Sequence, residues 1–505
     1  MRGREVTRVA RTGRECVYPG PVSEVRASEP VAVAEIAHWH AQADVVVVGL
    51  GIAGACAALE AQAAGAEVLV LERAGGGGGT SANSGGLIYL GGGTPVQKTA
   101  GFDDTPEAMF QFLMAASQPG PCEAKIRSFC EGSVGHFHWL ERRGVPFKRS
   151  FHPEPGMECR TDDGLVYTGG EDCHPWRDLA PPAPRGHKPR TRGKAGPFLM
   201  QRMLAAVAER PIGITTDLRA DTLIWDAQEG RVVGVVARSA GEIRNLRARR
   251  GVILAAGGFV MNDGMVMRHA PQLARCNVRN GVEGDDGCGI RMGQGAGGET
   301  LRMGLGEVAL PATIPNRLSR GIYVNRQGLR FINEDTYYGH IGIEALFRQG
   351  GRVWLLLDEE IFERGLVGLK PAFVGASVAE LEVEAGFPDG ALQSTVAFYN
   401  RFAERGEDPL FHKRPVRIQP LTAPPFALID AGTEAMIYAT FTLGGLDTHV
   451  DGAVLTPDGH EIPGLYAAGR TAALFCGGGY PGSGISLADA SFFGRCAGRS
   501  AAAAA

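Results

Sequence analysis

The hydrophobic pattern is most regular between Asp44 and Arg73. Val45–Val48 form a run that is short enough for a buried parallel strand and too short for a membrane span. Ile52–Ala64 is an alanine-rich stretch of helix length that Gly65 ends, and Glu67–Leu71 is the next apolar run. This order predicts a buried strand, a tight turn, a helix that packs closely on a sheet, and a second strand.

Helical and strand periodicities alternate along the rest of the chain, which predicts an α/β fold. Helices are expected at residues 105–144, 199–209, 281–299, 390–404 and from about 485 onward. Strands are expected at residues 214–225, 232–238, 252–259, 353–357 and 462–469, with a β-hairpin at 321–334. Residues 151–197 are rich in Pro, Gly and charge, which is typical of a functional lid or a disordered loop. The alanine run at 501–505 is expected to be a tail after the last helix.

Three glycines directly after the first strand have the spacing G-x-G-x-x-G: Gly49, Gly51 and Gly54. The first turns the chain, the second lets the backbone approach a pyrophosphate, and the third lets the helix pack on the strand. Glu72 ends the second strand, 23 residues after Gly49 (72 − 49), where an acid takes ribose hydroxyls and disfavours a 2′-phosphate. The unit predicts a dinucleotide site, with an ordinary glycine turn as the alternative. Two other copies of the spacing lack the flanking strand and helix, and we interpret them as loops or small-residue packing: Gly293, Gly295 and Gly298, and Gly477, Gly479 and Gly482.

The glycine-rich stretch at residues 74–93 cannot pack a core, but it can wrap backbone amides around a diphosphate. Ser81, Asn83 and Ser84 could add polar contacts to the same ligand. The alternative interpretation is a flexible linker.

Composition narrows the classes of function. A chain of 505 residues can form two domains, and a net charge of −4 argues against a nucleic-acid surface or a polybasic membrane anchor. Ten cysteines without a C-x-x-C pair favour a reducing, cytoplasmic compartment, and no apolar run has transmembrane length. His136 and His138 would point apart on a helix, and no other histidines have ligand spacing, so no metal is expected.

Several segments in order resemble the flavoproteins related to fumarate reductase and succinate dehydrogenase. They are GLGIAG, TSANSGGLIYLGGG, LAAGGF, GIYVNRQGLRFINED, FTLGGL and IPGLYAAGR, and the resemblance extends from Asp44 to Gly498. It implies FAD, bound by a Rossmann-like α/β domain built from two sequence segments, with an inserted α+β catalytic domain. The expected boundaries are an N-terminal extension at 1–40, the FAD-binding domain at 41–275 and 431–500, and the catalytic domain at 276–430. A single dinucleotide fingerprint fits FAD without a separate NAD(P) domain.

The resemblance also assigns the cofactor contacts. No histidine lies in Thr80–Gly86, where covalent members attach the flavin, so FAD is expected to be noncovalent. The start of the helix at Ile485 is expected to face the flavin N1/C2=O edge, where a helix dipole stabilises an anion by roughly 0.3–2 kcal/mol. The implied contacts are Gly49, Gly51, Ile52, Ala53, Gly54, Glu72, Arg73, Thr80, Ser81, Ser84, Gly85, Gly86, Gly257, Gly469, Arg470, Ser486 and Leu487.

The chain departs from the fumarate-reducing members after Arg330-Phe331-Ile332-Asn333-Glu334, where Asp335-Thr336-Tyr337-Tyr338 contains no arginine. Tyr480-Pro481-Gly482-Ser483-Gly484 is similar to the motif of 3-ketosteroid dehydrogenases. Residues 85–98, 101–104 and 182–187 more closely resemble the branch that introduces a 4,5 double bond into 3-keto-5α-steroids. That branch ranks above the 1,2-dehydrogenating one.

This resemblance implies a catalytic set. The Tyr480 hydroxyl and the Gly484 backbone N–H would hold the 3-oxo group, with help from Ser483, although Ser483 could equally be a helix cap. Tyr337 or Tyr338 would be the base, and only one is expected to reach the flavin because neighbours on a strand face opposite ways. A phenolate at pH 7 costs about 4 kcal/mol, so a neighbour must take the proton or lower the pKa. His340 is a candidate relay or a surface histidine.

The leading hypothesis is therefore an FAD-dependent 3-ketosteroid dehydrogenase with a small steroid substrate and an unidentified electron acceptor. The alternatives are a 3-ketosteroid Δ1-dehydrogenase, a flavin reductase of an unsaturated acid or enone, and a flavin electron-transfer subunit without turnover. Glu307, Arg317, Arg320 and Arg330 lie in the region where acid-reducing relatives bind carboxylate, and Arg320 could do so here.

Overall fold

A nine-stranded sheet is the largest layer of the structure, a computed structural model that describes residues 27–154, 160–364 and 370–504. The predicted extension at residues 1–26 lies outside the described residues. The sheet has the order β1-β8-β9-β10-β2-β3-β7, and β10 also pairs with β21, which pairs with β20. Its strands are β1 (Val31–Ala32), β2 (Ala41–Val48), β3 (Val68–Leu71), β7 (Ile212–Thr215), β8 (Arg219–Asp226), β9 (Arg231–Ser239), β10 (Glu242–Leu254), β20 (Ala453–Leu455) and β21 (Glu461–Ala467).

The parallel centre of this sheet comes from two distant parts of the sequence. β2 pairs in parallel with β3 and β10, and β10 pairs in parallel with β21. The valines of β2 are buried because the sheet is covered on both faces at this point, which is why their pattern is continuous rather than alternating. The predicted strand at 252–259 is only the end of β10, whose first half is antiparallel to β9. The predicted strand at 214–225 is two strands, β7 and β8.

Three helices lie beside this sheet: α1 (Ile52–Ala63) packs against both α7 (Gly196–Ala208) and α13 (Ile485–Ala503). The backbones of α1 and α13 approach closely, because a Cβ on Gly494 would lie 2.5 Å from the Ala53 carbonyl oxygen and one on Gly498 would lie 2.2 Å from that of Ala57. The prediction that residues 501–505 are a tail after the last helix is wrong for residues 501–503, because α13 continues through them. Ala501 and Ala502 are buried against the core.

Residues 79–187, inside the first segment of the predicted FAD-binding domain, are more ordered in their described part than the sequence suggests. The single helix expected at 105–144 is interrupted around Pro119 and forms two helices. In the described part of 151–197, short strands pair with one another, and Arg185 is fully buried in an ion pair with Asp104 at 2.7 Å. These elements are α2 (Gly79–Asn83), α3 (Pro95–Thr99), α4 (Pro106–Ala116), α5 (Glu123–Arg142), α6 (Trp176–Leu179), β4 (Ile88–Tyr89), β5 (Leu165–Val166) and β6 (Gly186–His187).

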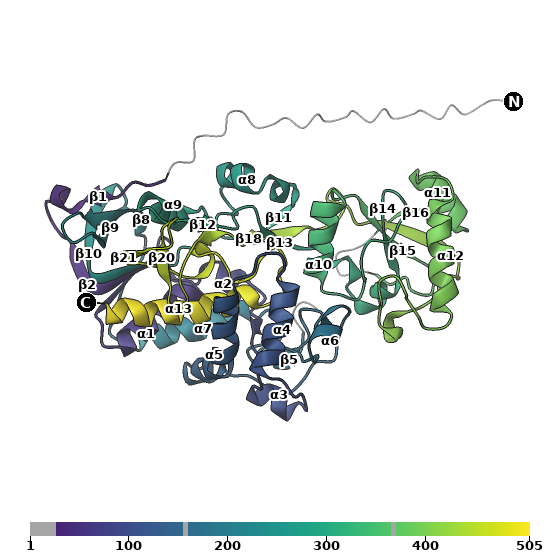
Figure 1. Ribbon diagram of the computed structural model, residues 1–505, viewed down its shortest axis with the longest axis horizontal. Coiled ribbons are helices and arrows are strands. Elements are labelled where there is room, and N and C mark those ends of the chain that lie inside the picture. Colours follow the sequence, from purple (N-terminus) through teal and green to yellow (C-terminus); the bar gives the residue numbers. More distant parts are fainter. Residues whose placement is uncertain (1–26, 155–159, 365–369, 505) are drawn as a thin grey trace.

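A second body, at the right of Figure 1, contains a four-stranded antiparallel sheet with the order β14-β15-β17-β16. Its core joins apolar residues between Phe259 and Tyr438. Small sheets connect it to the first body, because β18 pairs with β11 and β13, and β19 pairs with β12. The elements are α8 (Asp263–His269), α9 (Cys288–Gly295), α10 (Tyr338–Ile343), α11 (Val378–Ala385), α12 (Ala391–Ala403), β11 (Val278–Arg279), β12 (Thr300–Leu301), β13 (Gly306–Ala309), β14 (Ile322–Asn325), β15 (Val353–Leu357), β16 (Pro371–Gly375), β17 (Phe426–Asp430), β18 (Ala439–Thr442) and β19 (Gly445–Leu446).

The hairpin expected at 321–334 forms only its first strand and its turn. β14 pairs with β15, and only an isolated bridge joins Val324 to Arg330. The Arg330 side chain instead forms buried ion pairs with Glu334 and Asp408, which hold the second half of the segment away from a regular strand.

The α/β class with an inserted α+β part is confirmed, whereas the domain boundaries set from the sequence stay a prediction.

We predict that Gly498→Ala destabilises the protein by about 1–3 kcal/mol, because the added methyl group would overlap the backbone of α1. Gly135→Ala is the matched control: Gly135 is an exposed residue inside α5, and its Cβ would meet nothing within 4 Å. Alanine is a better helix former than glycine by about 1 kcal/mol, so the control should not lower the melting temperature. Thermal unfolding checks both variants, and an unchanged melting temperature for Gly498→Ala would contradict the close packing.

Candidate active site

A cavity of about 1200 Å³ lies where the parallel strands of the large sheet end. It is bordered by the residues that follow β2, β3, β10 and β21, which is where open α/β sheets place their ligands. The cavity is larger than the roughly 300–1000 Å³ that a drug-sized ligand needs, so it has room for a large cofactor together with a substrate.

The turn after β2 and the first turn of α1 each have one position that accepts only glycine. Gly49 has φ 101°, and its Cβ would lie 2.5 Å from the Ala255 carbonyl oxygen. A Cβ on Gly54 would lie 1.9 Å from the Gly49 carbonyl oxygen. Gly54 therefore packs α1 against the turn and does not border the cavity, whereas every other predicted cofactor contact does. Whether those residues contact the cofactor stays a prediction.

The Glu72 carboxylate is buried and held in place by two backbone amides. Oε2 accepts a hydrogen bond from the Leu50 N–H and Oε1 accepts one from the Ala74 N–H, both at 2.9 Å. Each carboxylate oxygen has a further lone pair, so these bonds orient the group without using up its capacity to accept ribose hydroxyls.

Asp285 is a central residue of the site that sequence reasoning missed. It pairs with Arg470 at 2.9 Å in a largely buried ion pair and accepts a short hydrogen bond from the Thr80 hydroxyl. It also accepts the Gly258 amide, and a Cβ on Gly257 would overlap its carboxylate. Thr80 and Arg470 are 205 and 185 residues away in sequence, so no local motif could have indicated them.

Cationic groups border the same part of the cavity. Arg73 and Arg219 both contact the Asp286 carboxylate, at 3.0 and 3.3 Å, and the Lys194 ammonium donates to the Asn83 carbonyl oxygen. The Ser81 hydroxyl accepts the Ile52 amide at the start of α1. This set of basic and amide groups is suited to a pyrophosphate.

Three tyrosines and a serine meet at the other part of the cavity. The Tyr338 hydroxyl lies 2.5 Å from the Ser483 Oγ, and the Tyr337 hydroxyl lies 3.4 Å from the same oxygen. The Tyr337 ring centroid lies 4.4 Å from that of Tyr338 and 6.4 Å from that of Tyr480. Burial is the main reason that the pKa of Tyr337 is raised well above its usual value, and the neighbouring Tyr338, Glu307 and Tyr480 raise it further.

The strand on which Tyr337 and Tyr338 were expected to face opposite ways does not form. Tyr337 is the N-cap residue of α10 and Tyr338 is its first residue, and both border the cavity. Whether only one of them reaches the flavin stays a prediction. The interpretation of Ser483 as a helix cap is also wrong, because Gly484 is the N-cap of α13 and no side chain caps this helix. Gly484 has φ 97°, and its Cβ would lie 2.8 Å from the Tyr89 nitrogen, so glycine is required there.

The Tyr480 hydroxyl is polarised by the start of α13. Its oxygen accepts the Ser486 backbone N–H at 2.8 Å, which leaves its own hydrogen available for another acceptor. Burial raises the pKa of Tyr480 well above its usual value, and the Ser486 amide opposes this shift. Tyr480 is therefore a neutral donor that can strengthen its hydrogen bond as charge develops on an acceptor.

His340 is not a surface residue. Its ring packs against Tyr337 with 5.4 Å between centroids, and its Nδ1 lies 3.4 Å from the Thr336 hydroxyl oxygen. Burial lowers its pKa to about 4, so the imidazole is neutral at pH 7. His340 packs beside the tyrosines, and a hydrogen bond with the Tyr480 backbone partly opposes the lowering of its pKa.

Apolar side chains complete the tyrosine end of the cavity. Ala309, Pro311, Ile437, Ala439 and Phe441 border it, together with the buried carboxyl group of Glu307.

The arginines considered as carboxylate ligands lie elsewhere. Arg320 donates to the Gln419 side chain, Arg317 to the Glu360 carbonyl oxygen, and Arg330 is held by Glu334 and Asp408. Among the described residues, these three arginines do not border the cavity. The interpretation of Arg320 as a carboxylate ligand is therefore not supported.

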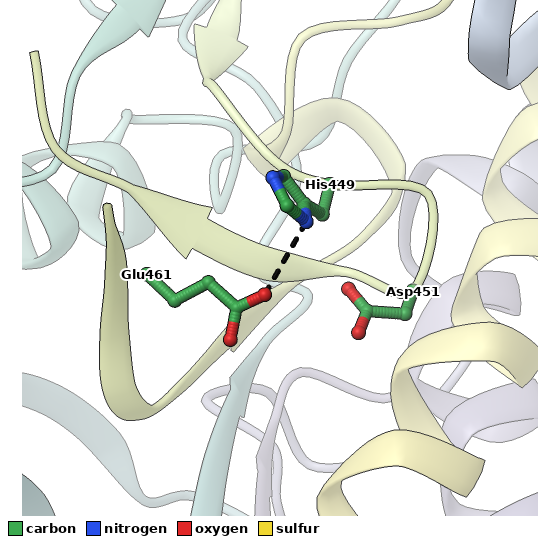
Figure 2. Close-up of side chains that lie close together, drawn as sticks. All are labelled: His449, Asp451 and Glu461. Atoms are coloured by element: carbon green, nitrogen blue, oxygen red, sulfur yellow. Dashed lines mark ion pairs between the residues drawn. The ribbon is translucent and has the colours of Figure 1, made fainter. Parts of the chain in front are cut away.

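An exposed trio that the histidine spacing did not indicate lies outside the cavity. Figure 2 shows His449 and Asp451 on the loop before β20 and Glu461 at the start of β21. Their ligand atoms lie within 4.8 Å of one another. His449 Nδ1 lies 3.3 Å from Glu461 Oε1, so the histidine and the glutamate already pair with each other. Exposed groups of this kind are common without an ion, and their geometry alone assigns no metal.

Within the described residues, none of the helices combines the length and the apolar character needed to cross a membrane.

The chain matches known proteins over most of its length. A family model described as the FAD binding domain matches residues 44–487. A crystal structure of a 3-ketosteroid-Δ4-(5α)-dehydrogenase from Rhodococcus jostii RHA1 in complex with 4-androstene-3,17-dione is 46% identical, with a TM-score of 0.90 over 94% of this chain and 99% of that one. A 3-oxo-5-alpha-steroid 4-dehydrogenase from Comamonas testosteroni is 29% identical over 524 aligned residues, which cover 89% of this chain and 96% of the relative. A 3-ketosteroid Δ1-dehydrogenase from Sterolibacterium denitrificans, at 23% identity and a TM-score of 0.70 over 92% of this chain and 99% of that one, shares the fold.

We predict that Asp285→Asn destabilises the protein by about 3–5 kcal/mol, because it leaves the Arg470 guanidinium buried without a counter-charge. The variant should also retain less FAD, since Asp285 positions Thr80 and Arg470 at the cavity. Glu107→Gln is the control, because it removes an exposed carboxylate that also pairs with an arginine, Arg127. The melting temperature and the visible absorbance per chain after desalting check the prediction. Equal values for the two variants would refute the role of Asp285.

Proposed function

The chain belongs to the family defined by the FAD binding domain, and from this premise we propose that it desaturates ring A of a 3-keto-5α-steroid between C4 and C5. The observation that carries the proposal is the group of Tyr480, Ser483 and the Tyr337–Tyr338 pair at an apolar cavity. The relatives described as 4-dehydrogenases of 3-oxo-5α-steroids support the same choice.

The residues present fit FAD. The backbone of Gly49 and Gly51 borders the cavity, and Glu72 is oriented for ribose hydroxyls. Arg470 borders the cavity, and its buried Nη1 has no hydrogen-bond partner among the described residues. This N–H group can therefore donate a hydrogen bond to a bound cofactor. Residues Thr80–Gly86 contain no histidine, which supports noncovalent binding. When bound, FAD supplies the hydride acceptor.

Tyr480 and Gly484 hold the substrate ketone in this proposal. A hydrogen bond from the Tyr480 phenol to the 3-oxo group strengthens as negative charge develops on the oxygen, and losing one such donor typically costs about 2.7–4 kcal/mol of transition-state stabilisation. The backbone N–H of Gly484 is the second donor, at the start of α13 where the helix dipole favours negative charge.

The base is the phenol of Tyr337 or Tyr338. Both hydroxyls contact Ser483, so either can take the proton from C4 and share it along the same hydrogen bonds. Because burial raises the pKa of Tyr337, a phenolate is not formed in advance, and the hydroxyl must give up its own proton as it gains another.

A neutral steroid fits the apolar lining better than a dicarboxylate does. Charge-assisted pairs with arginine carry most of the affinity for a dicarboxylate, and Arg317, Arg320 and Arg330 are engaged elsewhere. We place the reaction in the cytoplasm, because all cysteines of the described residues are free thiols. The electron acceptor that reoxidises the flavin is a cellular or artificial partner.

We predict that anaerobic addition of a 3-keto-5α-steroid bleaches the flavin of the purified protein, and that a dye acceptor restores its colour with formation of the 4,5-unsaturated ketone. A 3-keto-4-ene steroid is the control, because its ring A already has the product bond. Bleaching by that control with formation of a 1,2 double bond would favour the Δ1 alternative. Inertness to both steroids together with oxidation of reduced dye by an unsaturated acid would favour the reductase. A yellow protein that no substrate bleaches would favour an electron-transfer subunit.

We predict that Tyr480→Phe slows flavin reduction about 100- to 1000-fold, the rate equivalent of one lost oxyanion donor. At least one of Tyr337→Phe and Tyr338→Phe should be slowed about as strongly, because a phenylalanine cannot transfer a proton. Tyr466→Phe is the control, since it also removes a tyrosine hydroxyl but Tyr466 does not border the cavity. Stopped-flow absorbance measures the rates. If both Tyr337→Phe and Tyr338→Phe keep near-normal rates, the tyrosine base is excluded.

A further inference from the structure

Glu307 is a buried acid to which the proposed reaction assigns no role. Glu307 lies on β13 and is only 3% exposed to solvent. It borders the cavity beside the tyrosines. In the described residues no cation pairs with it. Burying an acid without a cationic partner destabilises a fold, so a purely structural explanation of Glu307 is weak.

The Glu307 carboxyl group ends a connected chain of hydroxyls. The Tyr338 hydroxyl lies 2.5 Å from the Ser483 Oγ, the Ser483 Oγ lies 3.4 Å from the Tyr337 hydroxyl, and the Tyr337 hydroxyl donates to Glu307 Oε1 at 3.3 Å. Both candidate bases are therefore connected to Glu307: Tyr337 directly, and Tyr338 through Ser483 and Tyr337.

We infer that Glu307 is the terminal proton acceptor of this hydroxyl chain, and that it acts through Tyr337 during the desaturation. This inference rests on the proposed function. It also resolves the difficulty that the sequence raised, because a tyrosine can serve as a base at neutral pH only if a neighbour takes its proton.

The step balances without a further reactant. The C4–H bond breaks, and its proton forms an O–H bond on the phenol that faces the substrate. Each hydroxyl passes its own proton along the hydrogen bonds, and the last proton binds the Glu307 carboxylate, which becomes neutral. The electron pair of the C4–H bond forms the double bond as the hydrogen on C5 leaves as hydride to the bound acceptor.

The surroundings of Glu307 make it a stronger base than an ordinary carboxylate. Burial raises its pKa to about 8, and the hydrogen bond from Tyr337 only partly opposes this shift. The other titratable groups that face it are the phenol of Tyr480 and the thiol of Cys276, which are neutral at pH 7. A general base works best when its pKa lies near the operating pH, so a raised pKa suits a proton acceptor.

The test compares Glu307→Gln with the wild type. Glutamine keeps the shape and can still accept the Tyr337 hydrogen bond, but it cannot take the proton. Glu344→Gln is the matched control, because burial also raises the pKa of Glu344, which pairs with Arg348 and does not border the cavity. Flavin reduction by a 3-keto-5α-steroid should be at least about 100-fold slower in Glu307→Gln and unchanged in Glu344→Gln.

The pH profile separates proton transfer from a structural effect. In the wild type the rate should rise with pH as Glu307 becomes a carboxylate and level off above about pH 8. Glu307→Gln should lose this rise. Tyr337→Phe interrupts the chain whichever tyrosine is the base, so Tyr337→Phe and the double variant Tyr337→Phe/Glu307→Gln should be equally slow.

Two measurements need no substrate. Infrared difference spectra should show a protonated carboxyl group in the wild type that titrates near pH 8 and is missing in Glu307→Gln. Because the folded pKa lies above that of an unfolded carboxyl group, the wild type loses stability as the pH rises through about 8, whereas Glu307→Gln does not. The melting temperature of Glu307→Gln relative to the wild type should therefore increase between about pH 5 and pH 8.

The relay is refuted if a wild type that the steroid bleaches has the same rate or the same pH profile as Glu307→Gln. It is also refuted if no carboxyl group titrates near pH 8. A wild type that no 3-keto-5α-steroid bleaches refutes the proposed function and the relay together, so the two failures are distinguishable.

Discussion

The backbone contact between α1 and α13 is the constraint on which the site depends. Gly494 and Gly498 allow the two helices to approach until their backbones touch, at Ala53 and Ala57. Both helices begin at the cavity, α1 after the turn at Gly51 and α13 after the turn that contains Ser483. Their spacing therefore fixes the distance between the part of the cavity suited to a pyrophosphate and the part that contains the tyrosines. A cofactor that spans both parts can bind only if this spacing is kept.

The tyrosine end of the cavity packs proton-bearing groups together in their neutral forms. Glu307, Tyr337 and Tyr480 are all buried, and burial raises the pKa of each. Groups that are neutral at neutral pH can be packed together, because no ionised group has to be desolvated in the resting state. Each of them can change its protonation state or share its proton when charge develops nearby. The site thus combines a low local polarity, which suits a steroid, with groups that respond to an enolate.

The features that the sequence predicted have local signatures. The turn from Gly49 to Gly54 and the strand and helix around it follow from residues adjacent in the chain, and so does the start of α13 near Ile485. Asp285 could not be predicted, because its importance arises from Thr80 and Arg470, which meet only in the folded chain. The orientation of Tyr337 and Tyr338 was misjudged for a related reason: the pair follows a segment with strand character, but α10 begins at this point and packs on β13, which is distant in sequence.

The position of Glu307 at the cavity could not be predicted from the sequence pattern, but it follows from the strand pairing in the fold. On β13 it stands opposite Phe441 of β18, and its carbonyl oxygen accepts the Thr440 hydroxyl, so the strand pairing fixes the backbone and the side chain must enter the cavity. In the described residues no arginine binds the carboxyl group there. Once ionised, this carboxyl group can take a proton, whereas an arginine in its place could only donate one. A buried acid at this end of the cavity therefore suits a site that removes a proton beside a ketone.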